Sequence, residues 1–217
     1  MDWTDLEKHF SNARLGRYRA SCGGDQVKAA QAYAHNLLLA EAMMPMLSVL
    51  EIALKNGIHR HLSTLYRRGD WWETWNGAPL FTRQLDEVVA ARAKLQRRNE
   101  QTTPDKIIAE LAFGFWSSLF NKSFQTVLWH ELRLVFPRCP RHQRQRHTVS
   151  AALNQLRALR NRVFHHEQLL WLTPSLLDLH AKGVEVIGWL DPKLVPWLGG
   201  MDRLPMVWAA SQLNLRP

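Results

Sequence analysis

The densest group of reactive side chains lies in one short stretch, Leu159-Arg160-Asn161-Arg162-Val163-Phe164-His165-His166-Glu167. RNA cleavage by the neighbouring 2′-hydroxyl needs a group that removes the hydroxyl proton, a group that protonates the leaving 5′-oxygen, and positive charge beside the phosphate. Histidine can perform either proton transfer near neutral pH, because its unperturbed pKa is about 6.5. The stretch therefore holds the groups that metal-independent cleavage of RNA needs, and the alternative is a structural role in which Arg160 and Glu167 bind shared partners near one face of the helix. In the cleavage scheme Arg160 stabilises the phosphate charge, His165 is the general acid or base, and Asn161 orients His165 or the phosphate.

The spacing of these residues conflicts with a single straight helix. At about 100° per residue, Arg160 and His165 point roughly 140° apart, whereas Asn161 and His165 share a face. Three arrangements could bring arginine and histidine to one phosphate. The helix could unwind near Phe164, the long Arg160 side chain could bend round, or two copies of the motif could meet across a dimer.

The basic residues are concentrated around this stretch. The chain carries 28 Lys and Arg against 19 Asp and Glu, a formal net charge of +9. Residues 132–166 contain eight arginines and no acidic residue or lysine. Such a segment predicts a phosphate-binding surface, and an alternative is a solvated basic face or one that neutralises acidic residues elsewhere. The arginines that we expect to bind RNA are Arg138, Arg141, Arg144, Arg146, Arg157 and Arg162.

Two further polar residues interrupt the most apolar part of the chain. Glu51 needs a partner if it is buried, and it could pair with Lys55 one turn later or reach Arg160 and hold it in place. Asn56 is either a surface amide or a contact of the motif. His166 and Glu167 are supporting candidates beside the proposed catalytic residues.

The composition excludes several classes of protein. Two cysteines, Cys22 and Cys139, are too few for a disulfide-stapled secreted domain or a four-cysteine zinc site. We expect no metal and no other cofactor, because adjacent helical residues such as His165 and His166 do not converge on one ion. No signal peptide is visible, and the apolar stretch 37–54 contains two glutamates. These features predict a cytoplasmic protein without a membrane span.

Apolar residues recur at helical spacing, and no segment reads as a confident strand. We therefore predict one all-α domain over residues 1–217, with no sheet. Asp25, Thr4 and Thr173 are expected caps, Pro45 is expected to kink or restart a helix, and the tryptophan-rich loop 67–79 should pack onto the helices. The expected helices cover about 4–10, 26–43, 45–65, 82–98, 104–116, 124–136, 143–167, 174–188 and 204–213, with 191–217 as a C-terminal extension.

The motif and several other blocks resemble one known family. Arg160-Asn161-x-x-x-His165 is similar to the arginine, polar residue, three spacers and histidine of the HEPN superfamily, in the version found in Abi-like (abortive infection, AbiD/AbiF type) proteins. Other blocks resemble that family in the expected order over about residues 4–190. They include 6–11, 14–18, Tyr33-x-x-Asn36, 50–56, Asp70-Trp71-Trp72, 111–116 and Phe136-Pro137. One departure is Gln168, where the family often has proline.

The resemblance implies a HEPN-type helical bundle with additional helices, which forms a homodimer. It also implies a metal-independent endoribonuclease of an abortive-infection, antiphage or toxin system, with a cognate antitoxin or defence-system partner. Carried over to this chain, the catalytic set is Arg160, Asn161 and His165. Many members of the superfamily have lost cleavage, so the alternative is a non-catalytic module that binds RNA or another protein.

Overall fold

The computed structural model describes residues 2–214, and every regular element in that range is helical. The predicted all-α class is therefore confirmed. The α-helices are α1 (Trp3–Phe10), α2 (Asn12–Ser21), α3 (Gln26–Tyr66), α4 (Thr82–Arg97), α5 (Pro104–Glu110), α6 (Phe113–Ser118), α7 (Trp129–Leu132), α8 (Arg146–Phe164), α9 (Leu176–Leu190), α10 (Leu194–Gly199) and α11 (Leu204–Asn214). Short 3₁₀ turns lie at Trp71–Trp75, Pro79–Phe81, Lys122–Phe124 and Arg133–Val135.

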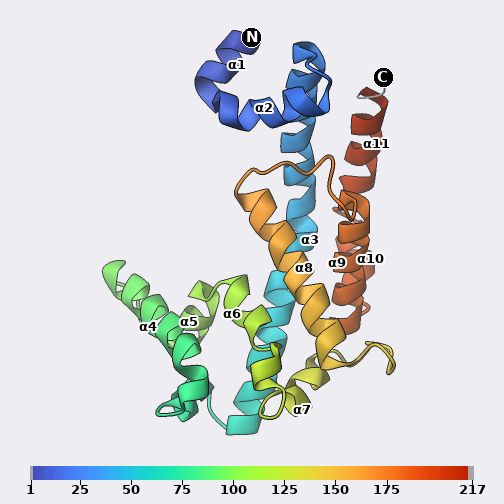
Figure 1. Ribbon diagram of the computed structural model, residues 1–217. Coiled ribbons are helices and arrows are strands. Elements are labelled where there is room, and N and C mark those ends of the chain that lie inside the picture. The colour runs from blue at the N-terminus through green and yellow to red at the C-terminus, as the bar shows by residue number, and fades with distance from the viewer. Residues whose placement is uncertain (1, 215–217) are drawn as a thin grey trace.

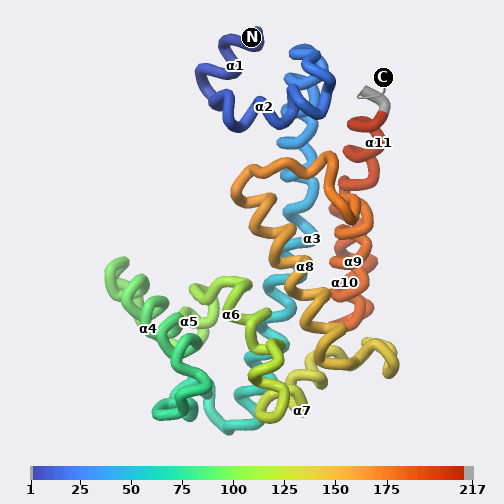
Figure 2. The backbone as a smooth tube through the Cα atoms, in the orientation of Figure 1, coloured from blue at the N-terminus to red at the C-terminus, as the bar shows by residue number. Residues whose placement is uncertain are grey.

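Helix α3 is the axis of the molecule, and the other helices are arranged along it (Figure 1). Helices α1 and α2 lie at one end of α3, and α4 and α5 project at the other end. Helices α8, α9 and α11 run beside α3, and the chain after α8 turns back past α2 before it enters α9 (Figure 2). Two segments far apart in sequence, α2 and the end of α8, are thus brought together.

Helix α3 is one uninterrupted helix of 41 residues, which corrects the expected division at Pro45. Its start is as predicted, because the Asp25 carboxylate accepts hydrogen bonds from the backbone N–H groups of Val27 and Lys28. Pro45 lies inside the helix, where packing against α2, α9 and α11 outweighs its local cost. Long-range contacts thus override the local proline signal.

The apolar composition of α3 has two consequences. An 18-residue stretch of this helix is long and apolar enough to cross a membrane, with a mean hydropathy of 1.8, and half of it is buried inside the protein. The core helix of a soluble protein has the same properties. The remaining half leaves large apolar side chains at the surface, including Leu37, Leu38 and Met44.

The tryptophan-rich loop packs onto the helices as predicted. Trp71, Trp72 and Trp75 are buried, and the Trp71 ring contacts the rings of Trp72, Trp75 and Trp116 edge to face. The Trp71 indole N–H donates to His59 Nδ1 over 3.1 Å. This cluster joins α3 to α6.

Other expected boundaries are wrong where tertiary contacts decide them. The expected helix 104–116 is broken at Leu111 and Ala112, whose backbone is extended, and the expected helix 124–136 is reduced to α7 between two 3₁₀ turns. The segment 140–144 forms a turn on Pro140, so α8 begins at Arg146 and not at 143. Its last residue is Phe164, three residues before the expected end.

Two expected caps are also wrong. Asp2, not Thr4, caps α1 by accepting the backbone N–H of Asp5. Helix α9 follows a cis Thr173–Pro174 bond and is capped by Ser175, which forms a capping box with Asp178. The capping box was present in the sequence and is a better start signal than Thr173.

Candidate active-site cleft

The predicted catalytic stretch lies at the C-terminal end of α8. Helix α8 ends at Phe164, and the next two residues form a Schellman-type turn. Glu167 N–H donates to the Arg162 carbonyl over 2.8 Å, and His166 N–H donates to the Val163 carbonyl over 3.2 Å. His166 takes the left-handed conformation that this turn requires, with φ of 54°. His165 and His166 therefore leave the helix cylinder and follow the turn.

A buried asparagine on α3 fixes the chain after this turn. The Asn36 side-chain N–H group donates to the Glu167 carbonyl over 3.1 Å, and its carbonyl accepts the Leu169 N–H over 2.7 Å. Asn36 is fully buried, so both bonds are shielded from water. In the sequence Asn36 is marked by the Tyr33-x-x-Asn36 block, and that block does not indicate a role in the site.

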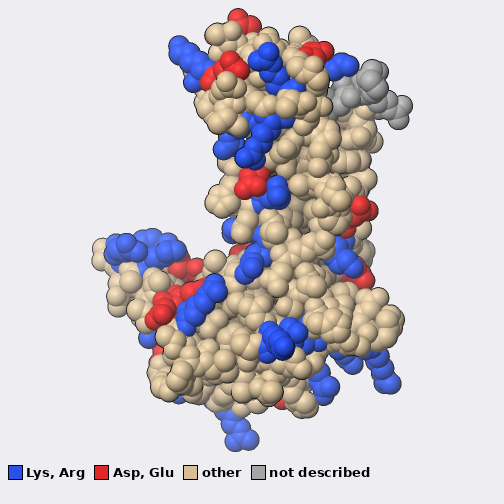
Figure 3. All heavy atoms as spheres, in the orientation of Figure 1, with Lys and Arg blue, Asp and Glu red and all other residues tan. Residues whose placement is uncertain are grey.

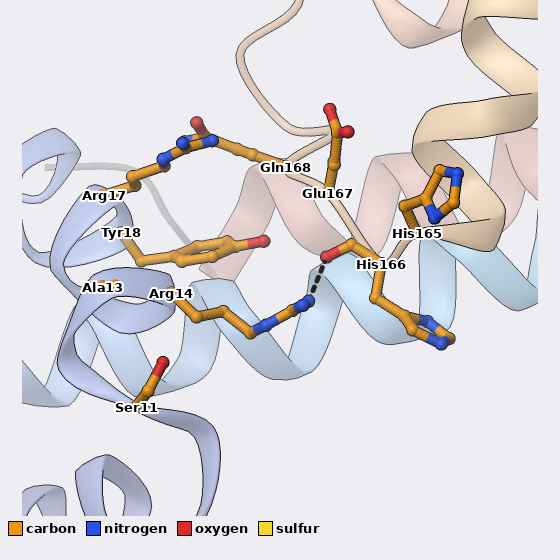
Figure 4. Close-up of a pocket in the computed structure, with 9 residues that line it drawn as sticks. All are labelled: Ser11, Ala13, Arg14, Arg17, Tyr18, His165, His166, Glu167 and Gln168. Carbon is orange, nitrogen blue, oxygen red and sulfur yellow. Dashed lines mark hydrogen bonds between the residues drawn. The ribbon is translucent and has the colours of Figure 1, made fainter.

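The turn forms one wall of an open cleft of about 640 Å³. Helix α2 forms the opposite wall (Figure 4). The cleft is lined by Ser11, Ala13, Arg14, Arg17, Tyr18, His165, His166, Glu167 and Gln168. Of the predicted site residues, the cleft thus holds His165, His166 and Glu167, and it adds three polar residues of α2 that sequence reasoning had not placed in the site.

The cleft has more positive than negative charge. Arg14 donates one guanidinium hydrogen bond to the His166 carbonyl over 2.7 Å (Figure 4). None of the ion pairs described for residues 2–214 includes Arg14 or Arg17. The one carboxylate in the lining, Glu167, lies 3.2 Å from the Arg162 guanidinium and is thereby compensated.

Arg160 lies apart from this cleft. Its guanidinium carbon lies 4.1 Å from the centre of the Phe164 ring, and its Nε atom lies 3.4 Å from Glu51 Oε2. Of the two partners that we considered for Glu51, the structure gives Arg160. The side chains of Glu51 and Arg160 are 22% and 28% exposed, so the pair is partly screened from water. The helix does end at Phe164, and Arg160 does not line the cleft that contains His165.

The two remaining candidate residues, Asn161 and Asn56, are at the surface. The Asn161 side chain is exposed, and its backbone carbonyl accepts the His165 N–H over 2.9 Å. Asn56 is exposed on α3, where none of the hydrogen bonds described for residues 2–214 involves its side chain. Asn56 therefore fits the surface-amide alternative and not a contact of the motif.

Comparison with protein-family models, with curated proteins and with solved structures finds no match to this chain. The HEPN-type family therefore stays a prediction from the residues quoted above. Any function proposed for this chain therefore rests on its own residues and on the geometry of the cleft.

The arginines of the acid-free segment do not form one patch. Helix α8 has 19 residues and is about 28 Å long, which separates the loop carrying Arg138, Arg141 and Arg144 from the motif. Arg146 has a structural role, since it donates to the Phe120 carbonyl and to Gln125. Figure 3 shows Lys and Arg side chains distributed over the whole length of the visible face. An RNA strand that contacts both the loop arginines and the motif would therefore have to run along the length of α8.

The titratable groups of the cleft do not form a metal site. Within the described residues, no group of three or more His, Cys, Asp or Glu side chains is placed to hold a metal ion. The cleft is lined by two imidazoles, a phenol and two guanidinium groups that have no carboxylate partner among residues 2–214.

Proposed function

We propose that this protein is a metal-independent endoribonuclease of the abortive-infection or toxin type. The observation that carries the proposal is the meeting of His165 with Arg14 and Arg17 across one open cleft. An RNA strand in this cleft would have its backbone charge balanced by arginine and its scissile phosphate near the exposed His165 imidazole. Such a site provides general acid–base catalysis and electrostatic stabilisation.

In this mechanism His165 either removes the 2′-hydroxyl proton or protonates the leaving 5′-oxygen, and His166 is the candidate for the opposite transfer. Asn161 lies one turn before His165 with its side chain exposed, and its amide is the candidate that orients His165 or the phosphate. The Arg160 guanidinium packs on the Phe164 ring and lies beside Glu51, next to the motif turn. Arg160 is then available to a phosphate bound at an interface.

The proposal includes a homodimer, because Arg160 does not line the cleft of its own chain. The face next to Arg160 is an apolar groove of about 420 Å³ between α3 and α8. Its exposed members include Leu37, Met44 and Phe164, which are 41%, 36% and 43% exposed. A second copy on this face would bury these side chains and bring a second motif toward Arg160.

Mixing two inactive variants tests this composite site. Arg160→Ala and His165→Ala should each be inactive alone, and an equal mixture should regain about a quarter of wild-type cleavage, since half of the dimers hold one intact site of two. Sedimentation should show a dimer at micromolar concentration. A monomer, or a mixture that stays inactive, would remove the dimer from the proposal.

Cleavage of labelled single-stranded RNA in EDTA tests the site itself. We expect His165→Ala and Arg160→Ala to lose at least about 100-fold in rate, the usual effect of losing a proton-transfer or charge-stabilising group. His147→Ala is the matched control, since His147 is exposed on the same helix and lies outside the cleft. Equal rates for all four proteins would reject the proposed site.

A second function is favoured by the position of Arg160. Its guanidinium packs on Phe164 beside Glu51 and does not line the cleft that contains His165, as expected for a motif that no longer cleaves. In that case the protein binds RNA through its arginines without catalysis. Tight, salt-sensitive binding of RNA without cleavage by the wild-type protein would support this alternative.

A further inference from the structure

The cleft wall opposite His165 contains a buried hydroxyl without a partner. The Tyr18 side chain is only 2% exposed, and its hydroxyl makes no hydrogen bond within residues 2–214. Figure 4 shows this hydroxyl directed from α2 toward the chain at His166 and Glu167. Buried hydroxyl groups are nearly always paired, because an unpaired one loses its bonds to water. Tyr18 is therefore a donor whose acceptor is not supplied by the fold.

The chemistry of this hydroxyl favours an anionic acceptor. Burial, followed by the nearby Tyr33, raises the pKa of Tyr18, while Arg14 and Arg17 act in the opposite direction. The phenol therefore keeps its proton at neutral pH and can donate it to an oxygen atom. The neighbouring arginine charges exclude a cationic ligand.

Arg14 and Arg17 share the cleft face of α2 with Tyr18. The three residues stand at i, i+3 and i+4, the spacing that places side chains together on one helix face. Arg14 uses one N–H group to hold the His166 carbonyl, and the other N–H groups of its guanidinium remain available. Arg17 is exposed and has no carboxylate partner among the described residues.

We infer that Arg14, Arg17 and Tyr18 form a phosphate subsite that holds an internal phosphodiester of single-stranded RNA, next to the bond that faces His165. The choice of RNA as ligand rests on the proposed function. The subsite supplies guanidinium forks and one phenol O–H, which match the several acceptor oxygens of a phosphodiester. Because the Arg14 guanidinium also holds the His166 carbonyl, a bound phosphate would be linked directly to the turn that carries His165.

Binding measurements in an inactive His165→Ala background test the subsite without cleavage. We expect Arg17→Gln and Tyr18→Phe each to weaken binding of a short single-stranded RNA by about tenfold, as for loss of a hydrogen bond to a charged group. Arg17→Gln should also reduce the slope of log affinity against log salt by about 0.7. Arg19→Gln is the matched control, because Arg19 is exposed on the same helix and does not line the cleft.

Tyr18→Phe provides a second and independent measurement. If the Tyr18 hydroxyl has a hydrogen-bond partner only when a ligand is bound, Tyr18→Phe should be as stable to urea as the wild-type protein, or more stable, while its RNA binding is weaker. A loss of stability in Tyr18→Phe would show that the hydroxyl already has a partner in the fold, and would overturn the subsite. Equal RNA binding by Arg17→Gln, Tyr18→Phe and Arg19→Gln would also overturn it.

Two comparisons show which phosphate of the RNA is bound and whether the subsite depends on catalysis. Arg17→Gln should weaken the binding of RNA with a 5′-hydroxyl and of RNA with a 5′-phosphate equally. A weakening seen only for RNA with a 5′-phosphate would show that the subsite binds a chain end and not an internal phosphodiester. Weakened binding in a protein that never cleaves RNA would retain the subsite and reject the endoribonuclease. Active cleavage with unchanged binding would do the opposite.

Discussion

At the scale of single residues, the site depends on backbone positions as much as on side-chain chemistry. His166 occupies the left-handed position of the turn after α8, where glycine is the usual residue. The turn is held on both sides, by Arg14 at the His166 carbonyl and by Asn36 at the Glu167 carbonyl. The motif histidines are thus placed by residues more than a hundred positions earlier in the chain.

The strained backbone at His166 gives the first prediction. His166→Gly should be more stable than His166→Ala by about 1 kcal/mol, because glycine adopts this conformation without steric cost. Urea unfolding of the two variants measures the difference. An alanine variant as stable as the glycine variant would show that the turn in solution differs from the one described.

A second prediction concerns acid stability. His59 Nδ1 accepts the Trp71 N–H, which requires this nitrogen to be unprotonated, and burial lowers the pKa of His59. The unfolded chain binds this proton below about pH 6.5 more readily than the folded protein, so stability falls as the pH is lowered through that range. Burial also lowers the pKa of His180, with the same sign.

Urea unfolding followed by tryptophan fluorescence at pH 7.5 and 5.5 measures this effect. The wild-type protein should be less stable at pH 5.5, and His59→Gln should lose less stability between the two conditions. The exposed variant His147→Ala should behave as the wild-type protein does. A wild-type stability that rises on acidification would contradict the account of His59.

At the scale of elements, local signals placed some helix boundaries and missed those that depend on packing. Asp25 caps α3 as expected because a cap depends only on the next three residues. The break at Leu111 and Ala112 and the continuity through Pro45 depend on packing with distant helices, which spacing does not reveal. For the same reason the sequence located His165 and His166 but not Arg14, Arg17, Tyr18 or Asn36, which the fold brings to them.

The contact between α3 and α9 supports the third prediction. A Cβ atom at Gly183 would clash with Met46 Sδ, and Met46 is itself buried. Gly183→Ala should therefore cost about 1–3 kcal/mol through overpacking. Gly188→Ala on the same helix should keep or gain up to about 1 kcal/mol, since its Cβ would meet Val195 at 3.5 Å. Equal stability of both variants would mean that α3 and α9 are less closely packed.

At the scale of the whole molecule, the helices bring a basic cleft and an apolar face to the two sides of one turn. The cleft contains His165, and the apolar groove contains Phe164, against which Arg160 packs. The acid-free segment 132–166 suggested that the net charge of +9 is concentrated at the motif. In the fold, the arginines of this segment are spread along the molecule. The proposed RNA path combines α2 with the turn after α8, and the proposed dimer completes it.

The identity of the RNA ends produced in EDTA tests the central claim most directly. Attack by the 2′-hydroxyl with His165 as acid or base predicts a 2′,3′-cyclic phosphate and a 5′-hydroxyl, formed by the wild-type protein and by His147→Ala but not by His165→Ala. Products with a 3′-hydroxyl and a 5′-phosphate, or the same products from His165→Ala, would contradict the proposed function.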